Sequence, residues 1–167
     1  MPALIALAVS VGVLAVVATW LYFLPALLAI ASVQVWQGFI AWGCHYHCGG
    51  KITGTRNTII CMSFGAVVGM AAALLAGHLG SLGTLGLPVA VGLGATVIVL
   101  SSKVPLLATI PASVYGFASI AGLMLLGKDM SPTKALLPTI LSIIIGAVFG
   151  YVSEAIAGAL TKQGAAA

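Results

Sequence analysis

The sequence has very little charge. Of its 167 residues, Lys and Arg together number 6 and Asp and Glu number 2, so charged residues make up 5% of the chain. An ordinary soluble domain carries about 25% charged residues. A water-soluble globule of this size must cover its surface with polar groups, and this composition cannot supply them. The shortage of charge therefore excludes a soluble globular protein.

Several other features are also missing. The six cations are scattered and form no basic stripe, which argues against a nucleic-acid partner. A hydrophobic content of 62% excludes disorder, and the 21 glycines follow no collagen-like period. No Walker loop, nucleophile elbow, His-Glu-x-x-His motif or pair of buried carboxylates occurs. We therefore expect no ATP-driven work, no enzyme activity and no cofactor.

Long apolar runs dominate the sequence. A helix that crosses the roughly 30 Å hydrocarbon core needs about 20 apolar residues. Runs between polar breaks give six candidates, at about 3–23, 25–48, 57–78, 83–101, 104–127 and 135–160. The first break depends on Pro25, which suits the first turn of a helix; the alternative is one long helix through 3–31, with five or fewer spans. We predict an all-α integral membrane protein with six transmembrane helices in a single domain over 1–167.

The loop cations predict the orientation in the membrane. With six spans, both termini lie on one side. The cations on that side are Lys51, Arg56, Lys103 and Lys162, and those on the other side are Lys128 and Lys134, with Asp129 beside them. The positive-inside rule then places both termini in the cytoplasm, by a narrow margin. No Lys or Arg precedes Leu4, so the N-terminal run does not read as a cleaved signal peptide.

The two halves of the sequence resemble each other. The matching pairs of segments, in order along the chain, are 25–30 with 105–110, 37–39 with 115–117, 50–51 with 127–128, 55–56 with 133–134, and 64–69 with 145–150. Each half holds three predicted spans, and an odd number turns the second copy upside down in the membrane. The sequence therefore predicts two inverted three-helix repeats, over about 1–80 and 81–162, an architecture common in transporters and channels.

A Gly-x-x-x-Gly pair recurs in the third span of each half. The pairs are Gly65 with Gly69 and Gly146 with Gly150. Glycines one turn apart let helix backbones approach closely in lipid. We predict that these four residues pack the third and sixth helices where they cross.

Polar side chains also occur inside the predicted spans. Gln37 and Tyr115 hold equivalent positions near mid-depth, beside Gly38 and Gly116, which leave room around them. Such groups usually face the bundle interior or a water-filled cavity. The predicted pathway lining consists of Gln34, Trp36, Gln37, Gly38, Ser113, Tyr115 and Gly116. The alternative is that these groups form hydrogen bonds that only hold the helices together.

The run 44–48 contains two cysteines and two histidines. On a helix, Cys44, His47 and Cys48 share one face, and thiolates with imidazole suit Cu(I) or Zn, with Cys61 as a possible fourth ligand. No second ligand pair completes a usual zinc site, so the alternative is that the cysteines pack as small apolar groups. His45 and His47 are also candidates for solute gating or pH sensing.

Glu154 is the only carboxylate inside a predicted span. It lies roughly 29 Å along the last span by the helical rise, which places it near the inner interface. A proton-coupling role at that position is a further hypothesis.

Segments 36–50 and 136–151 carry a recognisable pattern. It comprises Gly-Phe, Gly-Cys and Tyr followed by Gly-Gly, then a Leu-Pro beginning of the last span and a Phe-Gly-Tyr close. The pattern resembles the bacterial inner-membrane family typified by YcdZ, a domain of unknown function (DUF1097). His47 stands where we expect a small residue in that family. The resemblance implies an inner-membrane location and a chain of about this size, and it implies no particular activity.

These observations favour one function over two others. We expect a passive channel or facilitator for a small neutral or weakly polar solute across the bacterial inner membrane, because the middle of the spans carries so little charge. Six short helices leave much surface to bury, so we expect a homo-oligomer in the lipid bilayer. The alternatives are a membrane metal-binding or sensing module on the face of Cys44, His47 and Cys48, and a non-transporting interaction subunit.

Overall fold

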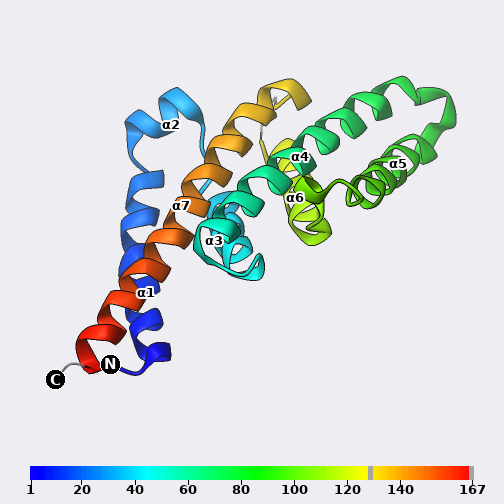
Figure 1. Ribbon diagram of the computed structural model, residues 1–167. Helices are drawn as coiled ribbons and strands as arrows, with labels where there is room; N and C mark the ends of the chain where they lie inside the picture. Colours follow the sequence, from blue (N-terminus) through cyan, green and yellow to red (C-terminus); the bar gives the residue numbers. More distant parts are fainter. Residues whose placement is uncertain (128–129, 166–167) are drawn as a thin grey trace.

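The computed structural model describes residues 1–127 and 130–165, without the side chains of 29–31 and 162–165. All regular structure in this part is helical (Figure 1). The α-helices are α1 (Ala3–Tyr22), α2 (Pro25–Ala31), α3 (Val35–His47), α4 (Lys51–His78), α5 (Gly86–Ser101), α6 (Ile110–Leu126) and α7 (Pro132–Ala165), and short 3-10 helices cover Gly80–Leu85 and Pro105–Leu107. The loop residues Lys128 and Asp129 and the side chain of Lys162, used above to predict orientation, lie outside the described residues.

In the part of the chain that the structure describes, four helical segments are long and apolar enough to cross a membrane. They are α1, α4, the segment Gly80–Ser101 that contains α5, and the segment Pro132–Thr161 of α7. The all-helical prediction is confirmed, and the long apolar helices are consistent with a transmembrane protein. The predicted break before Pro25 is present, because α1 ends at Tyr22 and α2 begins at Pro25. One long helix through 3–31 is therefore excluded.

The prediction of one continuous helix over 25–48 is wrong. The chain leaves the helix at Ser32, whose φ of 48° is left-handed, and is extended at Gln34 before α3 begins. A tertiary contact supports this break: the backbone N–H of Gln34 donates to Ser142 Oγ of α7 at 2.8 Å instead of to a carbonyl of its own helix. The predicted span 104–127 is interrupted too, because α6 starts at Ile110 after the short helix Pro105–Leu107.

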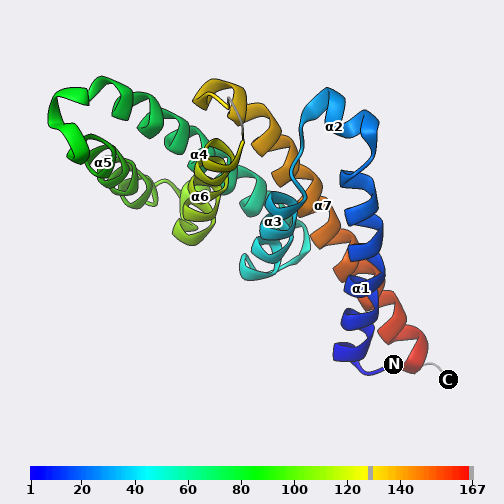
Figure 2. The same cartoon turned by 180° about the vertical axis from the view of Figure 1, so that it is seen from behind.

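Two long helices form the centre of the bundle. α7 packs against α3 and α1, α4 packs against α6 and α5, and α4 and α7 pack against each other. Figures 1 and 2 show α5 and α6 beside α4, with α1 beside α7. The last helix of each sequence half, α4 or α7, thus packs mainly against helices of the opposite half. Neither half can therefore bury its own apolar faces alone.

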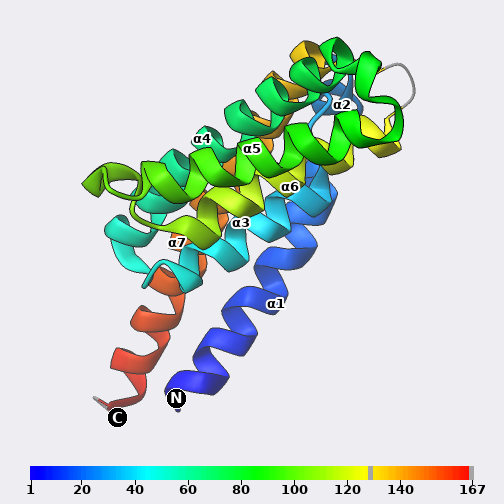
Figure 3. The same ribbon diagram turned by 90° about the vertical axis from the view of Figure 1, so that its right-hand side faces the viewer.

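The outer helices turn apolar side chains away from the bundle. Exposed aliphatic and aromatic residues on α1 include Leu4, Val16 and Trp20, and those on α5 include Leu87 and Val99. In lipid such surfaces need no protein cover. The two termini lie close together at one end, where α1 and the last turns of α7 extend beyond the other helices (Figure 3).

The four predicted packing glycines lie at close helix contacts, but with different partners from those expected. A Cβ on Gly65 would overlap the carbonyl group of Ser113 on α6, and one on Gly146 would overlap the carbonyl group of Gly38 on α3. Gly69 and Gly150 face the same two helices: a Cβ there would lie 2.6 Å from Ile120 Cγ2 and 2.7 Å from His45 Cβ, respectively. The glycines therefore hold α4 on α6 and α7 on α3, rather than α4 on α7.

Candidate functional site

A buried amide lies where α3, α6 and α7 meet. Gln37 of α3 is 0% exposed. Its Nε2 donates to the backbone carbonyl of Ser119 on α6 at 2.8 Å and to Thr139 Oγ1 on α7 at 3.0 Å. The other end of the amide, Oε1, has no partner among the described residues. Gln37, Ser119 and Thr139 are called the Gln37 cluster below.

Several buried side-chain oxygens on α3, α4 and α6 lack a hydrogen-bond partner among the described residues. Within the described part of the chain, the buried side-chain oxygens that lack a hydrogen-bond partner are Gln37 Oε1, Thr58 Oγ1, Ser63 Oγ and Ser119 Oγ. Buried polar atoms are nearly always paired in folded proteins. The described part of the bundle interior therefore has spare hydrogen-bonding capacity.

Tyr115 does not join Gln37. Its hydroxyl pairs with His47 Nδ1 at 3.2 Å, at the edge of an open groove of about 340 Å³ between α3 and α6. The lining of this groove is Phe39, Ile40, Gly43, Cys44, His47, Tyr115 and Ala118. Gln37 is sealed in the interior, so the two predicted lining residues lie in different surroundings.

The room predicted around Gly38 and Gly116 is occupied by protein. The space beside Gly38 holds the phenol of Tyr22, whose hydroxyl donates to the carbonyl of Ser142 at 2.9 Å. The space beside Gly116 holds the backbone carbonyl of Met62. These glycines permit close helix contacts and do not open a channel in this conformation.

The remaining predicted lining residues also make packing contacts. Gln34 Nε2 donates to the carbonyl of Ser32 at 2.9 Å. Trp36 is half-buried and lies against Gly122 of α6. Ser113 is buried, with its carbonyl against Gly65. These contacts are made by the side chains of Gln34 and Trp36 and by the backbone of Ser113.

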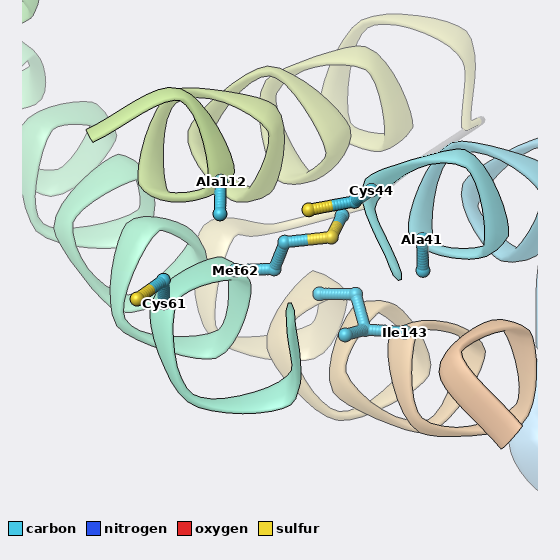
Figure 4. Packing of buried hydrophobic residues seen from close by; sticks show 6 residues of the cluster. All are labelled: Ala41, Cys44, Cys61, Met62, Ala112 and Ile143. Atoms are coloured by element: carbon cyan, nitrogen blue, oxygen red, sulfur yellow. The ribbon is translucent and has the colours of Figure 1, made fainter. Parts of the chain in front are cut away.

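The structure does not assemble the predicted metal ligands. Cys44 is buried with Met62 and Ile143 in an apolar cluster (Figure 4). Its Sγ lies 3.7 Å from Cys48 Sγ, while His47 turns to Tyr115 instead. Cys61 Sγ donates to the carbonyl of Leu106 at 3.6 Å. In the described residues no group of three or more His, Cys, Asp or Glu side chains could hold a metal ion. The cysteines behave as small apolar side chains, the alternative stated above.

The other polar site joins α3, α4 and α7 near the end of the bundle that carries the termini. His45 is 0% exposed. Its Nε2 lies 3.0 Å from Glu154 Oε2 of α7, and its Nδ1 lies 3.2 Å from Thr55 Oγ1 of α4. Glu154 Oε2 also accepts the backbone N–H of Lys51 at 2.5 Å. The side chain of Glu154 is 34% exposed, so this His45–Glu154 pair connects the interior to the surface.

A sharp turn between α3 and α4 positions this pair. Gly49, Gly50 and Lys51 all have left-handed φ values, 90°, 68° and 54°. Glycine adopts this conformation readily and lysine seldom does. The turn aims the first N–H of α4 at Glu154, whose carboxylate takes the place of a capping side chain at the positive end of the helix. Gly50 leaves the space that this carboxylate fills.

The hydrogen bonds around His45 permit two proton arrangements. Thr55 Oγ1 lies within reach of both His45 Nδ1, at 3.2 Å, and the carbonyl of Lys51, at 3.1 Å. With one ring proton, Nε2–H faces Glu154 and the Thr55 hydroxyl donates to Nδ1. With two ring protons, Nδ1–H donates to Thr55, whose hydroxyl turns to Lys51. Both arrangements keep the contacts of His45 with Glu154 and Thr55, while the Thr55 hydroxyl donates either to His45 Nδ1 or to the carbonyl of Lys51.

A second hydrogen-bonded centre lies beside the His45–Glu154 pair. Ser153 Oγ accepts from Trp42 Nε1 at 2.9 Å, pairs with the Tyr46 hydroxyl at 2.6 Å and donates to the carbonyl of Gly150 at 2.8 Å. Trp42 stacks on Phe149 with ring centroids 5.6 Å apart. These contacts join α3 to α7.

His45 and Glu154 were each predicted from the sequence as candidate functional residues, but not as a pair. The two residues are 109 positions apart, and the helix contact that joins them depends on Gly150. The available signal was that the one carboxylate of the spans and a histidine both fell near the same predicted end. Thr55 and Ser153 carried no sequence signal, because buried hydroxyls are common in apolar helices.

Fold and site together have the features of a helical transmembrane protein with a polar interior. The family described as "protein of unknown function (DUF1097)" matches residues 8–158, and the chain belongs to that family. This confirms the family expected from the sequence, whereas the likeness to YcdZ itself stays a prediction. No curated protein and no solved structure matches the chain.

Proposed function

We propose that the protein is a passive facilitator for a small neutral or weakly polar solute across the bacterial inner membrane, described here in a closed conformation. The observation that carries the proposal is the Gln37 cluster. It places an amide with a spare acceptor, and no charge, in the interior between helices of both sequence halves. Polar groups buried in a membrane bundle commonly mark a solute path.

The same proposal includes six membrane crossings arranged as two inverted repeats. Its support is the packing pattern: α1 and α3 pack on α7 as α5 and α6 pack on α4. The second crossing of each repeat, 25–48 in the first and 104–127 in the second, is also interrupted. Interrupted helices are common at transporter solute sites. Both termini would face the cytoplasm. A reporter fused to the C-terminus that works only in the cytoplasm tests this orientation, and an expressed fusion without reporter activity would contradict it.

The glycine contacts revise the alignment of the repeats. Gly65 and Gly146 are matched positions of the two repeats. Gly65 contacts Ser113 and Gly146 contacts Gly38, so Gly38 and Ser113 are equivalent in the revised alignment. Counting back one residue, Gln37 corresponds to Ala112 rather than to Tyr115. On this alignment the buried amide belongs to one repeat only, and the path would be asymmetric along its length.

The His45–Glu154 pair would act as the inner gate. It ties α7 to the turn between α3 and α4 through His45 and the backbone N–H of Lys51, and loss of these contacts would free α7 to move. Because α7 also carries Thr139 of the Gln37 cluster, movement of α7 would reach both sites. Gating by His47 remains a weaker proposal, because its Tyr115 contact lies at the surface groove.

Solute flux into proteoliposomes tests the facilitator. Wild-type protein should speed the entry of at least one of water, ammonia, methanol, formamide or urea over protein-free vesicles. Gln37→Met keeps a side chain of similar length and removes the amide, so it should reduce that flux. The control Thr96→Val removes a hydroxyl on exposed α5, where Thr96 donates only to Gly92, and should leave flux unchanged. Flux equal to protein-free vesicles for all five solutes would refute the facilitator.

The homo-oligomer expected from the sequence is also part of this proposal. The exposed apolar faces of α1 and α5 offer surface for a second copy as well as for lipid. Native mass spectrometry from lipid nanodiscs measures the copy number, and a single copy at all concentrations would contradict the expectation.

A further inference from the structure

We propose that Gln37 Oε1 and Ser119 Oγ together bind one small neutral molecule that carries both a hydrogen-bond donor and an acceptor. The proposal names the solute class of the facilitator and its binding groups, so it rests on the function proposed above. It adds Ser119, which had no role in the sequence analysis, and it places the guest at the junction of α3, α6 and α7.

The first argument is that both groups are spare. Gln37 and Ser119 are each 0% exposed, and Gln37 Oε1 and Ser119 Oγ have no partner among the described residues. They are also neighbours, because Gln37 Nε2 donates to the backbone carbonyl of Ser119 at 2.8 Å. Two unpaired polar groups at one buried place are unfavourable, and a guest that satisfies both removes that penalty.

The second argument fixes which atoms are free. Oxygen and nitrogen of a glutamine amide can be exchanged by a flip of the side chain. Here a flip would point Gln37 Oε1 at the Ser119 carbonyl, and two acceptors cannot bond to each other. The nitrogen therefore faces Ser119 and Thr139, with both of its N–H groups used. What remains is one acceptor, Oε1, and one hydroxyl, Ser119 Oγ, that can donate.

The third argument excludes an ion. The nearest His, Lys, Arg, Asp or Glu along α3 is His45, eight residues further, or roughly 12 Å by the helical rise, and His45 is paired with Glu154. An ion at Gln37 would be buried without a counter-charge, which is strongly unfavourable. Complete burial of both residues also restricts the guest to very few heavy atoms. Ammonia, methanol and formamide have this size and chemistry.

The test observes the guest on Gln37 directly. Full-length protein in nanodiscs, labelled with ¹⁵N at the glutamine side chains, gives a Gln37 amide signal that Gln37→Met identifies by its loss. Methanol or formamide is then titrated while nuclear Overhauser transfer from the guest to the Gln37 amide protons is measured. A saturable signal is expected in wild type. Ser119→Ala should weaken the apparent affinity by roughly fivefold, which corresponds to the loss of one hydrogen bond, while the control Thr96→Val should not change it.

Each other outcome overturns the proposal. No saturable transfer from either guest, in protein with a native spectrum, refutes the site. A water signal that neither guest displaces identifies a structural water and refutes the solute class. Unchanged affinity in Ser119→Ala removes Ser119 from the site. If Ser119→Ala does not fold, Ser119→Cys, which keeps a weak donor of similar size, serves instead and should give an intermediate affinity.

The flux assay separates this proposal from the facilitator. Guest binding at Gln37 without flux would leave the site standing and refute the facilitator. Flux that does not depend on Ser119 and occurs without transfer to the Gln37 amide would leave the facilitator standing and refute this site.

Discussion

Adding a single methyl group to α7 should separate two helices of the bundle. Gly146→Ala would place a Cβ inside the carbonyl group of Gly38 on α3, and the obstacle is backbone that cannot rotate away. The helices would have to part by about 1 Å or more to restore ordinary contact. The control is Gly158→Ala on the same helix, where a Cβ would meet nothing within 4 Å.

The comparison isolates the cost of the clash. Replacing Gly by Ala inside a helix favours folding by up to about 1 kcal/mol, and both variants share that gain. Overpacking costs about 1–3 kcal/mol, so Gly146→Ala should be less stable than Gly158→Ala by roughly that amount. Gly65→Ala and its control Gly77→Ala on α4 should repeat the difference, because Gly65 meets the Ser113 carbonyl in the same way.

The assay is unfolding in detergent micelles by a titration with a denaturing detergent, followed by the helical circular-dichroism signal. The free energies of unfolding of the four variants are compared under identical conditions. Equal stability of Gly146→Ala and Gly158→Ala would refute the close contact between α7 and α3. A loss in Gly146→Ala without one in Gly65→Ala would refute the equivalence of the two contacts.

Three further predictions follow from the described contacts. Ser153→Ala leaves the Trp42 indole N–H buried without its acceptor and should lower the free energy of unfolding by about 1–3 kcal/mol, more than Tyr46→Phe, which keeps the Trp42 bond; equal losses would argue against the Ser153 centre. Glu154→Ala removes the acceptor that caps α4 and pairs with His45, so the same titration should show a loss of about 0.5–2 kcal/mol, and Glu154→Gln, which keeps an oxygen, should lose less; identical losses would contradict the capping role. The two sequence halves expressed separately should be degraded, whereas their co-expression should yield a complex that purifies together, because α4 and α7 each complete the opposite half; a stable single half would contradict that packing.

Much of the architecture follows from the sequence. The long apolar runs and the few charges require helices in lipid, because a helix satisfies its own backbone hydrogen bonds there. Pro25 marks a helix start that the structure contains. The interruption at Ser32 could not be read in the same way, because the bond that supports it comes from Ser142, far away in the chain. Periodicity and composition report local preference and carry no information on such a partner.

The same contrast holds for the candidate site. Its position near the middle of an apolar run identified Gln37 as an unusual polar residue. Whether it lines a path or bonds to neighbours depends on which helices surround it. The structure surrounds it with Ser119 and Thr139 and separates it from Tyr115. In the same way the Cys44 run resembled a metal site until α3 was seen to bury that thiol beside Met62.

The sequence by itself determined that this chain is helical and apolar enough for a membrane, because burial in lipid is a property of each helix taken singly. Only the tertiary structure decided that α4 and α7 each pack on helices of the opposite half. It also decided which buried polar atoms remain unpaired and that His45 contacts Glu154. Those outcomes depend on backbone approaches at Gly146 and Gly150 between segments more than 100 residues apart. Such long-range contacts are selected by shape complementarity across the whole bundle, which no local pattern encodes.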